Sequence, residues 1–342
     1  MSNQNPFIGI RPFTEEDSAR FFGRAAVAER LSGLVRDYRI SALLGPSGYG
    51  KSSLVNCGVV RPLRERRARE EGGDALFPFV VRNWGEVLAD ESYNPNSSAG
   101  ELFATVLKNG ARAAFEADRT GKGRSKAFKE QAAQDAQRFE AVVEEVERDL
   151  AGNPNAFIAL VSALSYSFSG LVLVFDQFEE ILRQGKDRTS KISDVIARVT
   201  RVEGVRVLLS LRMEYRGSLR AIEKAVGTLA QSEIHLSGMP IDEAFSALQS
   251  MASEVAVTPG GEAGPPQKVK LSRDLLKLLF AQRQHVLAKE TQPVGLDLSV
   301  GRHQAHHGQC RHALAAAAFA DDAQDLALRE GKGNAVDDPR VA

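Results

Sequence analysis

The chain has 342 residues, a length that suggests two or three domains. Its 44 basic and 44 acidic residues cancel, so the net charge gives no reason to expect a nucleic acid or an anionic membrane as partner. No apolar run approaches the roughly 20 residues that span a bilayer, and the N-terminus lacks the regions of a signal peptide. The only cysteines, Cys57 and Cys310, lie far apart. We therefore expect a cytoplasmic protein without a disulfide framework.

Residues 1–24 are predicted to form an irregular N-terminal segment with one short helix. Thr14 and Asp17 have the spacing of a capping box, with Asp in place of the usual Glu or Gln. The sequence Phe-Phe-Gly-Arg ends this segment at Arg24. An amphipathic helix is then predicted from Ala25 to Tyr38.

A glycine-rich loop follows, between a short apolar strand over 39–44 and a helix that opens near Ser52. The loop has the pattern Gly-x4-Gly-Lys-Ser, which predicts a P-loop for a nucleoside triphosphate. Glycines let backbone N–H groups turn toward phosphates, and the start of a helix adds the positive end of its dipole. Lys51 is predicted to contact the outer phosphates, and the Ser52 hydroxyl to bind Mg²⁺. The predicted nucleotide-binding residues are Gly45, Pro46, Ser47, Gly48, Tyr49, Gly50, Lys51, Ser52 and Ser53.

Strands and helices alternate through the next part of the chain. A mixed-charge run over 64–71 is predicted to be a solvated helix end. Strands are predicted over 77–84, 171–175, 205–211 and 234–236, and helices over 99–115, 126–151, 155–168, 192–202 and 217–229. This alternation predicts the α/β class, with a doubly wound parallel sheet of the P-loop NTPase type.

Asp176 directly follows the continuous apolar strand over 171–175. It is therefore expected at the carboxyl edge of the sheet, where ligands bind in open α/β folds. An aspartate there can orient the water ligands of Mg²⁺, so Asp176 is predicted as the second metal residue beside Ser52. The alternative is a surface aspartate that caps the next helix.

The residue after this aspartate is Gln177, where many ATP-hydrolysing enzymes have a glutamate that activates water. A glutamine can orient water but cannot accept its proton in the same way. Glu179 or Glu180 can take the role of base, and the sequence does not choose between them. Slow turnover is expected.

Two arginines are further candidates for the same site. Arg212 closes the strand over 205–211 and can contact the outermost phosphate, with a surface pair to Glu214 as the alternative. Gly23 and Arg24 precede the first long helix. Arg24 either lies near the base and ribose or anchors the N-terminal segment, and both interpretations stay open.

The pattern changes after Pro240. The predicted domains are a P-loop NTPase domain over 1–236, a small helical lid over 237–290 and an irregular tail over 291–342. Within the lid, helices are expected over 241–255 and 271–290, with a Pro- and Gly-rich loop between them. The residues after about 295 are interpreted as a shifted reading frame or a degenerate end.

Several motifs together resemble one known family. They are residues 5–13, Phe22-Gly-Arg24, Gly45 to Val55, Gly58-Val-Val-Arg-Pro-Leu63 and Asp176-Gln-Phe-Glu-Glu180. In this order they are similar to the novel STAND NTPase domain of the signal-transducing ATPases with numerous domains, which are related to AAA+ proteins. The resemblance covers about residues 5–255.

The resemblance implies a regulatory ATPase that binds ATP and Mg²⁺ and forms a homo-oligomer in the ATP state, in bacterial signalling or defence. By motif match, Lys51, Ser52 and Asp176 carry the phosphate and metal roles, and Arg212 is the arginine after the sensor strand. Gly23 and Arg24 match the motif before the first helix. A repeat sensor or an effector region is expected but absent from this chain.

Two other functions are compatible with a P-loop. One is a P-loop kinase for a small molecule, which would need an arginine-rich lid that the 241–290 region lacks. The other is a nucleotide-binding remnant without turnover. Measuring the nucleotide that stays bound after purification, and then its hydrolysis with Mg²⁺, distinguishes the regulatory ATPase, the kinase and the remnant.

Overall fold

The computed structural model describes residues 11–69, 76–82, 84–89, 98–121, 125–150, 153, 155–183, 186–227, 229–253, 256–257 and 267–268. These residues form two compact units. One is Ala25–Gly238, and the other combines the described residues before Ala25 with those after Gly238. The predicted tail lies outside the described residues, and the predicted domain boundaries stay predictions.

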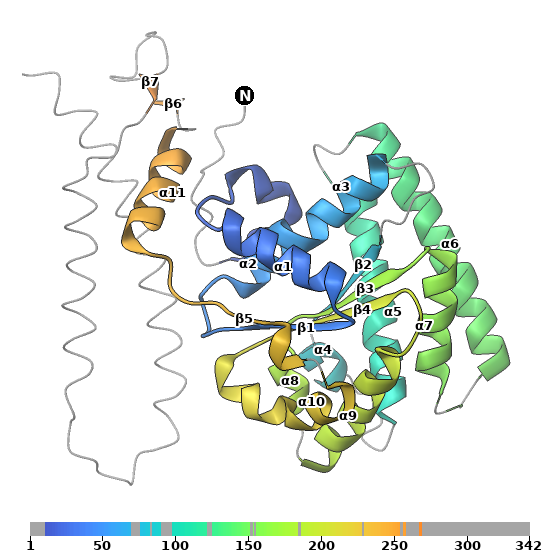
Figure 1. Cartoon of the computed structure of the whole chain (residues 1–342). Coiled ribbons are helices and arrows are strands. Elements are labelled where there is room, and N and C mark those ends of the chain that lie inside the picture. The colour runs from blue at the N-terminus through green and yellow to red at the C-terminus, as the bar shows by residue number, and fades with distance from the viewer. Residues whose placement is uncertain are drawn as a thin grey trace, which may run out of the picture. The chain divides into compact units, whose positions relative to one another are not determined.

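A five-stranded parallel sheet forms the centre of the larger unit (Figure 1), which confirms the predicted α/β class. The strands lie in the order β2-β3-β4-β1-β5. Their bounds are β1 Ile40–Leu44, β2 Phe77–Val81, β3 Leu171–Phe175, β4 Val205–Leu211 and β5 Glu233–His235. Because β4 pairs with both β1 and β3, the ends of these three strands lie next to one another.

Helices cover both faces of this sheet, so its central strands are largely apolar and almost wholly buried. Every residue of β1 and of β3 is buried, as expected for parallel strands covered on both sides. On one face, alternate strand residues join a single core with aromatic side chains from three long helices, α5 Ala99–Thr120, α6 Lys126–Leu150 and α7 Ala156–Ser167. On the other face lie α1 and the helix that follows the P-loop (Figure 1).

The predicted helices of the larger unit are present in order, with two additional short helices at Trp84–Ala89 and Glu179–Leu182. The strand predicted over 77–84 ends at Val81, and Trp84 begins a helix instead. The helices of this unit are α1 Ala25–Asp37, α2 Lys51–Val55, η2 Asn56–Val60, α3 Arg61–Arg69, α4 Trp84–Ala89, α5 Ala99–Thr120, α6 Lys126–Leu150, α7 Ala156–Ser167, α8 Glu179–Leu182, α9 Lys186–Val199, η3 Met213–Leu219, α10 Arg220–Val226 and η4 Leu229–Gln231. The helix predicted over 217–229 is divided into three short pieces, and α10 ends at Gly227, whose φ is +77°. A positive φ cannot continue a right-handed helix.

The helix after the P-loop changes its hydrogen-bonding pattern within its length. α2 passes into η2, a π-helical turn whose residues are all buried, and then into α3. Such π turns are rare and often occur at functional sites. Gly58 lies in this turn, where a Cβ would come within 2.8 Å of the Ala28 Cβ. The glycine therefore allows α1 and η2 to pack closely.

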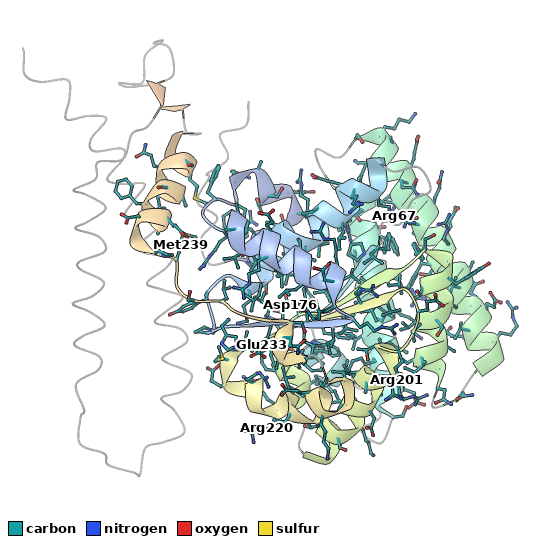
Figure 2. All side chains as sticks on the ribbon, in the orientation of Figure 1. Arg67, Asp176, Arg201, Arg220, Glu233 and Met239 are labelled. Atoms are coloured by element: carbon teal, nitrogen blue, oxygen red, sulfur yellow. The ribbon has the colours of Figure 1, made fainter. Side chains whose placement is uncertain are left out.

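The mixed-charge run in α3 is not solvated along its length, which corrects the prediction. Arg64 Nη1 lies 2.5 Å from Asp118 Oδ2 in α5, and both side chains are largely buried. The Arg67 guanidinium, labelled in Figure 2, lies over the rings of Phe77 and Phe168. The charge of Arg64 pairs with a carboxylate of α5, and the guanidinium of Arg67 packs on aromatic rings of the core. These two arginines therefore attach α3 to α5 and to the core.

The smaller unit contains η1 Glu15–Arg20 and α11 Ile241–Ser253. A φ of +77° at Gly23 and a hypothetical Cβ only 2.8 Å from Met239 Sδ both require glycine there. Two short strands, β6 Ala256–Val257 and β7 Gln267–Lys268, pair antiparallel where only a loop was expected. The helix predicted over 271–290 lies outside the described residues.

Asp17 organises the N-terminal segment. Its carboxylate accepts hydrogen bonds from Arg11 Nη1 at 2.7 Å and from the Thr14 amide and hydroxyl at 2.9 and 2.8 Å. The predicted capping box is therefore present. Burial by itself raises the pKa of the Asp17 carboxyl, but these hydrogen bonds and the Arg11 charge outweigh it and hold the pKa at about 2.

Replacing Asp17 by Asn is expected to destabilise the N-terminal segment by about 1–2 kcal/mol, because Arg11 and Thr14 lose a charged partner. The Asp17 pKa is lower in the folded state, so its contribution is present above the unfolded pKa near 4. It is lost as the pH falls from about 4 toward 2. Hydrogen exchange of residues 14–21 at pH 6 and pH 3 measures this. The same change in protection between pH 6 and pH 3 in the wild type and in Asp17→Asn would contradict this role of the Asp17 carboxylate.

Candidate functional site

The P-loop leaves β1 and enters α2 through two glycines in the left-handed region. Gly48 has φ +77° and Gly50 has φ +85°. A Cβ at either position would meet nothing within 4 Å, so the requirement there is conformational. At Gly45 the requirement is steric, because a Cβ would lie 2.9 Å from the Leu236 carbonyl oxygen. The loop residues from Pro46 to Gly50 are exposed, as a surface that receives a ligand must be.

The Lys51 side chain is folded back against its own loop. It is 9% exposed, and Nζ donates to the carbonyl oxygens of Gly45 and Pro46 at 2.9 and 3.0 Å. Burial lowers the pKa of the Lys51 ammonium, while the nearby carboxylates of Glu179 and Asp176 oppose that shift. Lys51 therefore lies within electrostatic range of the acids that follow β3.

Asp176 directly follows β3 and is labelled in Figure 2. It is only 2% exposed. Its Oδ1 accepts a hydrogen bond from the Gln177 amide at 3.1 Å, and its carbonyl oxygen accepts one from Trp84 Nε1 at 2.9 Å. The sequence analysis placed Asp176 at this edge of the sheet, and the structure does so too.

Arg82 is a neighbour of Asp176 that the sequence analysis missed. It follows β2, and its Nη2 lies 3.6 Å from Asp176 Oδ2 and donates to Asn56 Oδ1 at 2.8 Å. Asn56 is one helical turn after Ser52, so Arg82 joins the P-loop helix to Asp176. In the sequence, Arg82 is recognisable only as a charged residue at the end of an apolar strand. Its contact with Asp176 depends on the pairing of β2 with β3, which the sequence does not give.

The two glutamates after Asp176 have different partners. Glu179 is 5% exposed, and its Oε1 lies 3.1 Å from Arg212 Nε. Glu180 points elsewhere, and its Oε2 accepts a hydrogen bond from the Gly85 amide at 3.2 Å. Arg212 thus pairs with Glu179 and not with Glu214, the surface alternative.

Gln177 is exposed and has φ +54°, an uncommon value for a residue other than glycine. The turn that it makes carries the chain from β3 into α8. The side chain of Gln177 is exposed, whereas those of Lys51, Asp176 and Glu179 are buried.

Gly23 and Arg24 belong to the smaller unit. Burial lowers the pKa of Arg24, and the Glu243 carboxylate in α11 opposes that shift. This neighbour fits the interpretation of Arg24 as an anchor of the N-terminal segment. A contact of Gly23 or Arg24 with a nucleotide stays a prediction.

The described residues fit a magnesium nucleotide. The P-loop has conformationally permissive glycines and an exposed surface. Lys51 Nζ donates to carbonyl oxygens of the same loop, and the buried Asp176 carboxylate follows β3 at the same edge of the sheet. Ser52 and Asp176 are hard oxygen donors of the kind that Mg²⁺ prefers. Within the described part of the chain, no group of three His, Cys, Asp or Glu residues is arranged to hold a metal by itself. No described helix has the length and apolar character needed to cross a membrane.

Comparisons with known proteins give a family match and similar solved structures. The family described as Novel STAND NTPase 1 matches residues 6–318. A Walker-type ATPase, PABY2304 of Pyrococcus abyssi, is similar with a TM-score of 0.44 and 17% identity over 70% of this chain and 60% of that one. The Aeropyrum pernix ORC1 protein, solved in complex with DNA, is similar with a TM-score of 0.43 and 16% identity over 81% of this chain and 56% of that one. This chain therefore spans less than two thirds of either relative. A search of the curated proteins gave no match.

Replacing Arg82 by Met is expected to lower the free energy of unfolding by about 1–3 kcal/mol, because the buried Asp176 carboxylate loses its counter-charge. The lower part of this range applies because the Arg82 side chain is one third exposed. Arg119→Met is the matched control, since Arg119 pairs with Glu116 on an exposed surface of α5. Chemical denaturation measures both variants. Equal losses would show that the Asp176 pair is no more important than a surface pair.

Proposed function

Because the chain belongs to the Novel STAND NTPase 1 family, we propose that it is a regulatory ATPase module that binds Mg²⁺-ATP as a conformational switch. One observation supports this above the others. A P-loop lysine, a buried aspartate and an arginine–glutamate pair occupy the ends of three adjacent strands, β1, β3 and β4. Phosphoryl chemistry needs a cation at the phosphates, a carboxylate at the metal and a base near the attacking water.

In this proposal Lys51 exchanges its loop carbonyls for the outer phosphates. The carbonyl bonds keep the buried ammonium solvated by the protein until a ligand arrives, so the exchange costs little. Ser52 and Asp176 would hold Mg²⁺, which neutralises charge on the phosphates when it is bound. The P-loop amides from Gly48 onward bind the remaining oxygens.

Glu179 is the proposed base for the attacking water. It is the acid with the largest electrostatic effect on Lys51, whereas Glu180 is occupied by the Gly85 amide. The amide and the guanidinium of Arg212 fix the direction of the Glu179 carboxylate. Gln177 is too exposed in its turn to be preferred for this role.

Arg212 gives the site its proposed switch character. In this structure the guanidinium holds Glu179, so the two groups restrain each other. A terminal phosphate would attract Arg212 and release Glu179. Hydrolysis would then wait for that exchange, in agreement with slow turnover.

The proposed output of the switch is assembly of copies of the chain in the ATP state, in bacterial signalling or defence. The sensor and effector regions that would give and receive the signal are expected in accompanying sequence. A cytoplasmic location also stays a prediction.

The purified chain is expected to bind ATP and ADP, and Lys51→Ala to weaken that binding by at least about tenfold through the loss of a charge-assisted contact. Isothermal titration with Mg²⁺ present measures the affinities. Lys224→Ala is the control, because Lys224 is exposed on α10. Equal affinities in the three proteins would rule out the proposed nucleotide site.

Glu179→Gln is expected to slow single-turnover hydrolysis by roughly 10²–10⁴-fold, the usual contribution of a positioned base. Glu180→Gln is the matched control and is expected to change the rate by less than about threefold, because an amide oxygen can still accept from Gly85. The rate of γ-phosphate release is measured at saturating ATP. If the double variant keeps the wild-type rate, neither glutamate is the base. Binding without measurable hydrolysis would instead favour a nucleotide-binding remnant.

A further inference from the structure

The structure contains a buried hydroxyl for which the proposed function has so far given no role. Ser210 lies in β4 and is 0% exposed. Its Oγ has no hydrogen-bond partner among the described residues. A buried polar group without a partner costs stability, and such groups in native proteins usually serve a ligand, a water or a reaction.

The strand register places this hydroxyl beside Asp176. Phe175 pairs with Val81 on one side and with Leu209 on the other. One step further along the parallel strands, Asp176 has Arg82 and Ser210 as its two neighbours. The Phe178 amide donates to the Ser210 carbonyl oxygen at 2.9 Å, so the chain after Asp176 stays attached to β4. Adjacent strands are about 4.8 Å apart, which brings the Ser210 hydroxyl within reach of the Asp176 carboxylate after a side-chain rotation.

The three side chains also lie on the same face of the sheet. Leu209 and Leu211 belong to the core on the opposite face, so Ser210 between them points to the face that α2 covers. Arg82 contacts Asn56 in η2, directly after α2, and therefore lies on this face as well. Arg82, Asp176 and Ser210 thus form a row under the helix that begins at Lys51 and Ser52.

We propose that Ser210 is a positioning residue for the metal of the nucleotide site, and this inference rests on the proposed function. In the Mg²⁺-nucleotide state its hydroxyl donates to the Asp176 carboxylate from the β4 side, while Arg82 supports the carboxylate from the β2 side. The ion pair with Arg82 is loose at 3.6 Å, so the carboxylate has room to turn toward β4. A carboxylate fixed from both sides presents its oxygens to the metal in one orientation.

Ser210→Ala tests the proposal through metal dependence and stability, without an activity assay. Nucleotide affinity in EDTA is expected to stay within about twofold of wild type, because Ser210 serves the metal and not the phosphates. The Mg²⁺ concentration for half-maximal ATP binding is expected to rise about tenfold, as is common when a partner of a metal ligand is removed. The Tm of the ligand-free variant is expected to be no lower than that of wild type, because the lost hydroxyl has no partner to leave behind.

Ser41→Ala is the matched control. Ser41 is also 0% exposed and lies on the neighbouring strand β1, but its Oγ donates to the Leu34 carbonyl oxygen at 3.1 Å. This variant is expected to lose about 2–4 °C in Tm and to keep the wild-type Mg²⁺ dependence.

The outcomes separate this inference from the function that it rests on. If wild type binds ATP in a Mg²⁺-dependent way and Ser210→Ala shows the same dependence, Ser210 has no role at the metal although the nucleotide site stands. An equal loss of affinity with and without Mg²⁺ would also overturn the inference, because the hydroxyl would then serve the nucleotide or the fold. If wild type binds no nucleotide, the proposed function fails and the inference fails with it.

Discussion

The position of β4 between β1 and β3 is the constraint on which the candidate site depends. Parallel pairing in one register brings the ends of these strands to the same edge, although the residues that follow them are far apart in sequence. The P-loop follows β1, Arg212 follows β4 and Asp176 follows β3. Two strand spacings, about 10 Å, separate the loop from the aspartate. A phosphate group with its metal and two side chains can occupy that interval, and the sheet holds the interval fixed.

The charges at this edge are mutually satisfied in the structure as it stands. Lys51 donates to loop carbonyls, Arg212 pairs with Glu179, and Arg82 pairs with Asp176. Buried charges require such partners, since isolated ones cost several kcal/mol. A nucleotide that binds here must therefore replace existing ion pairs and hydrogen bonds, because these charged groups already have partners. Sites that work by exchange respond to small differences between ligands, as the proposed switch requires.

The parts of the molecule that sequence predicts well are those set by short, local patterns. The P-loop, the apolar strands β1 and β3 and the aspartate after β3 all follow from residues next to one another. Arg82 could not be found in this way, because its partner depends on which strands pair. The same holds for Arg64 and Arg67, whose charges suggested solvent exposure before their partners in α5 and α6 were known. Sequence spacing also made Glu179 and Glu180 equally good candidates for the base. The turn after Asp176 directs Glu179 toward Arg212 and Glu180 toward the Gly85 amide.

That turn has a consequence for how the protein can be altered. Gln177 adopts a left-handed backbone, which costs a residue with a side chain about 1–2 kcal/mol, yet three backbone amides in the turn are hydrogen-bonded. Glycine would remove that cost and would also widen the range of directions open to the chain beyond it. Replacing Gln177 by glycine would thus stabilise the turn but leave the direction of the Glu179 side chain less well defined. In the proposed function, the stability of this turn and the direction of Glu179 would therefore be opposed at this position.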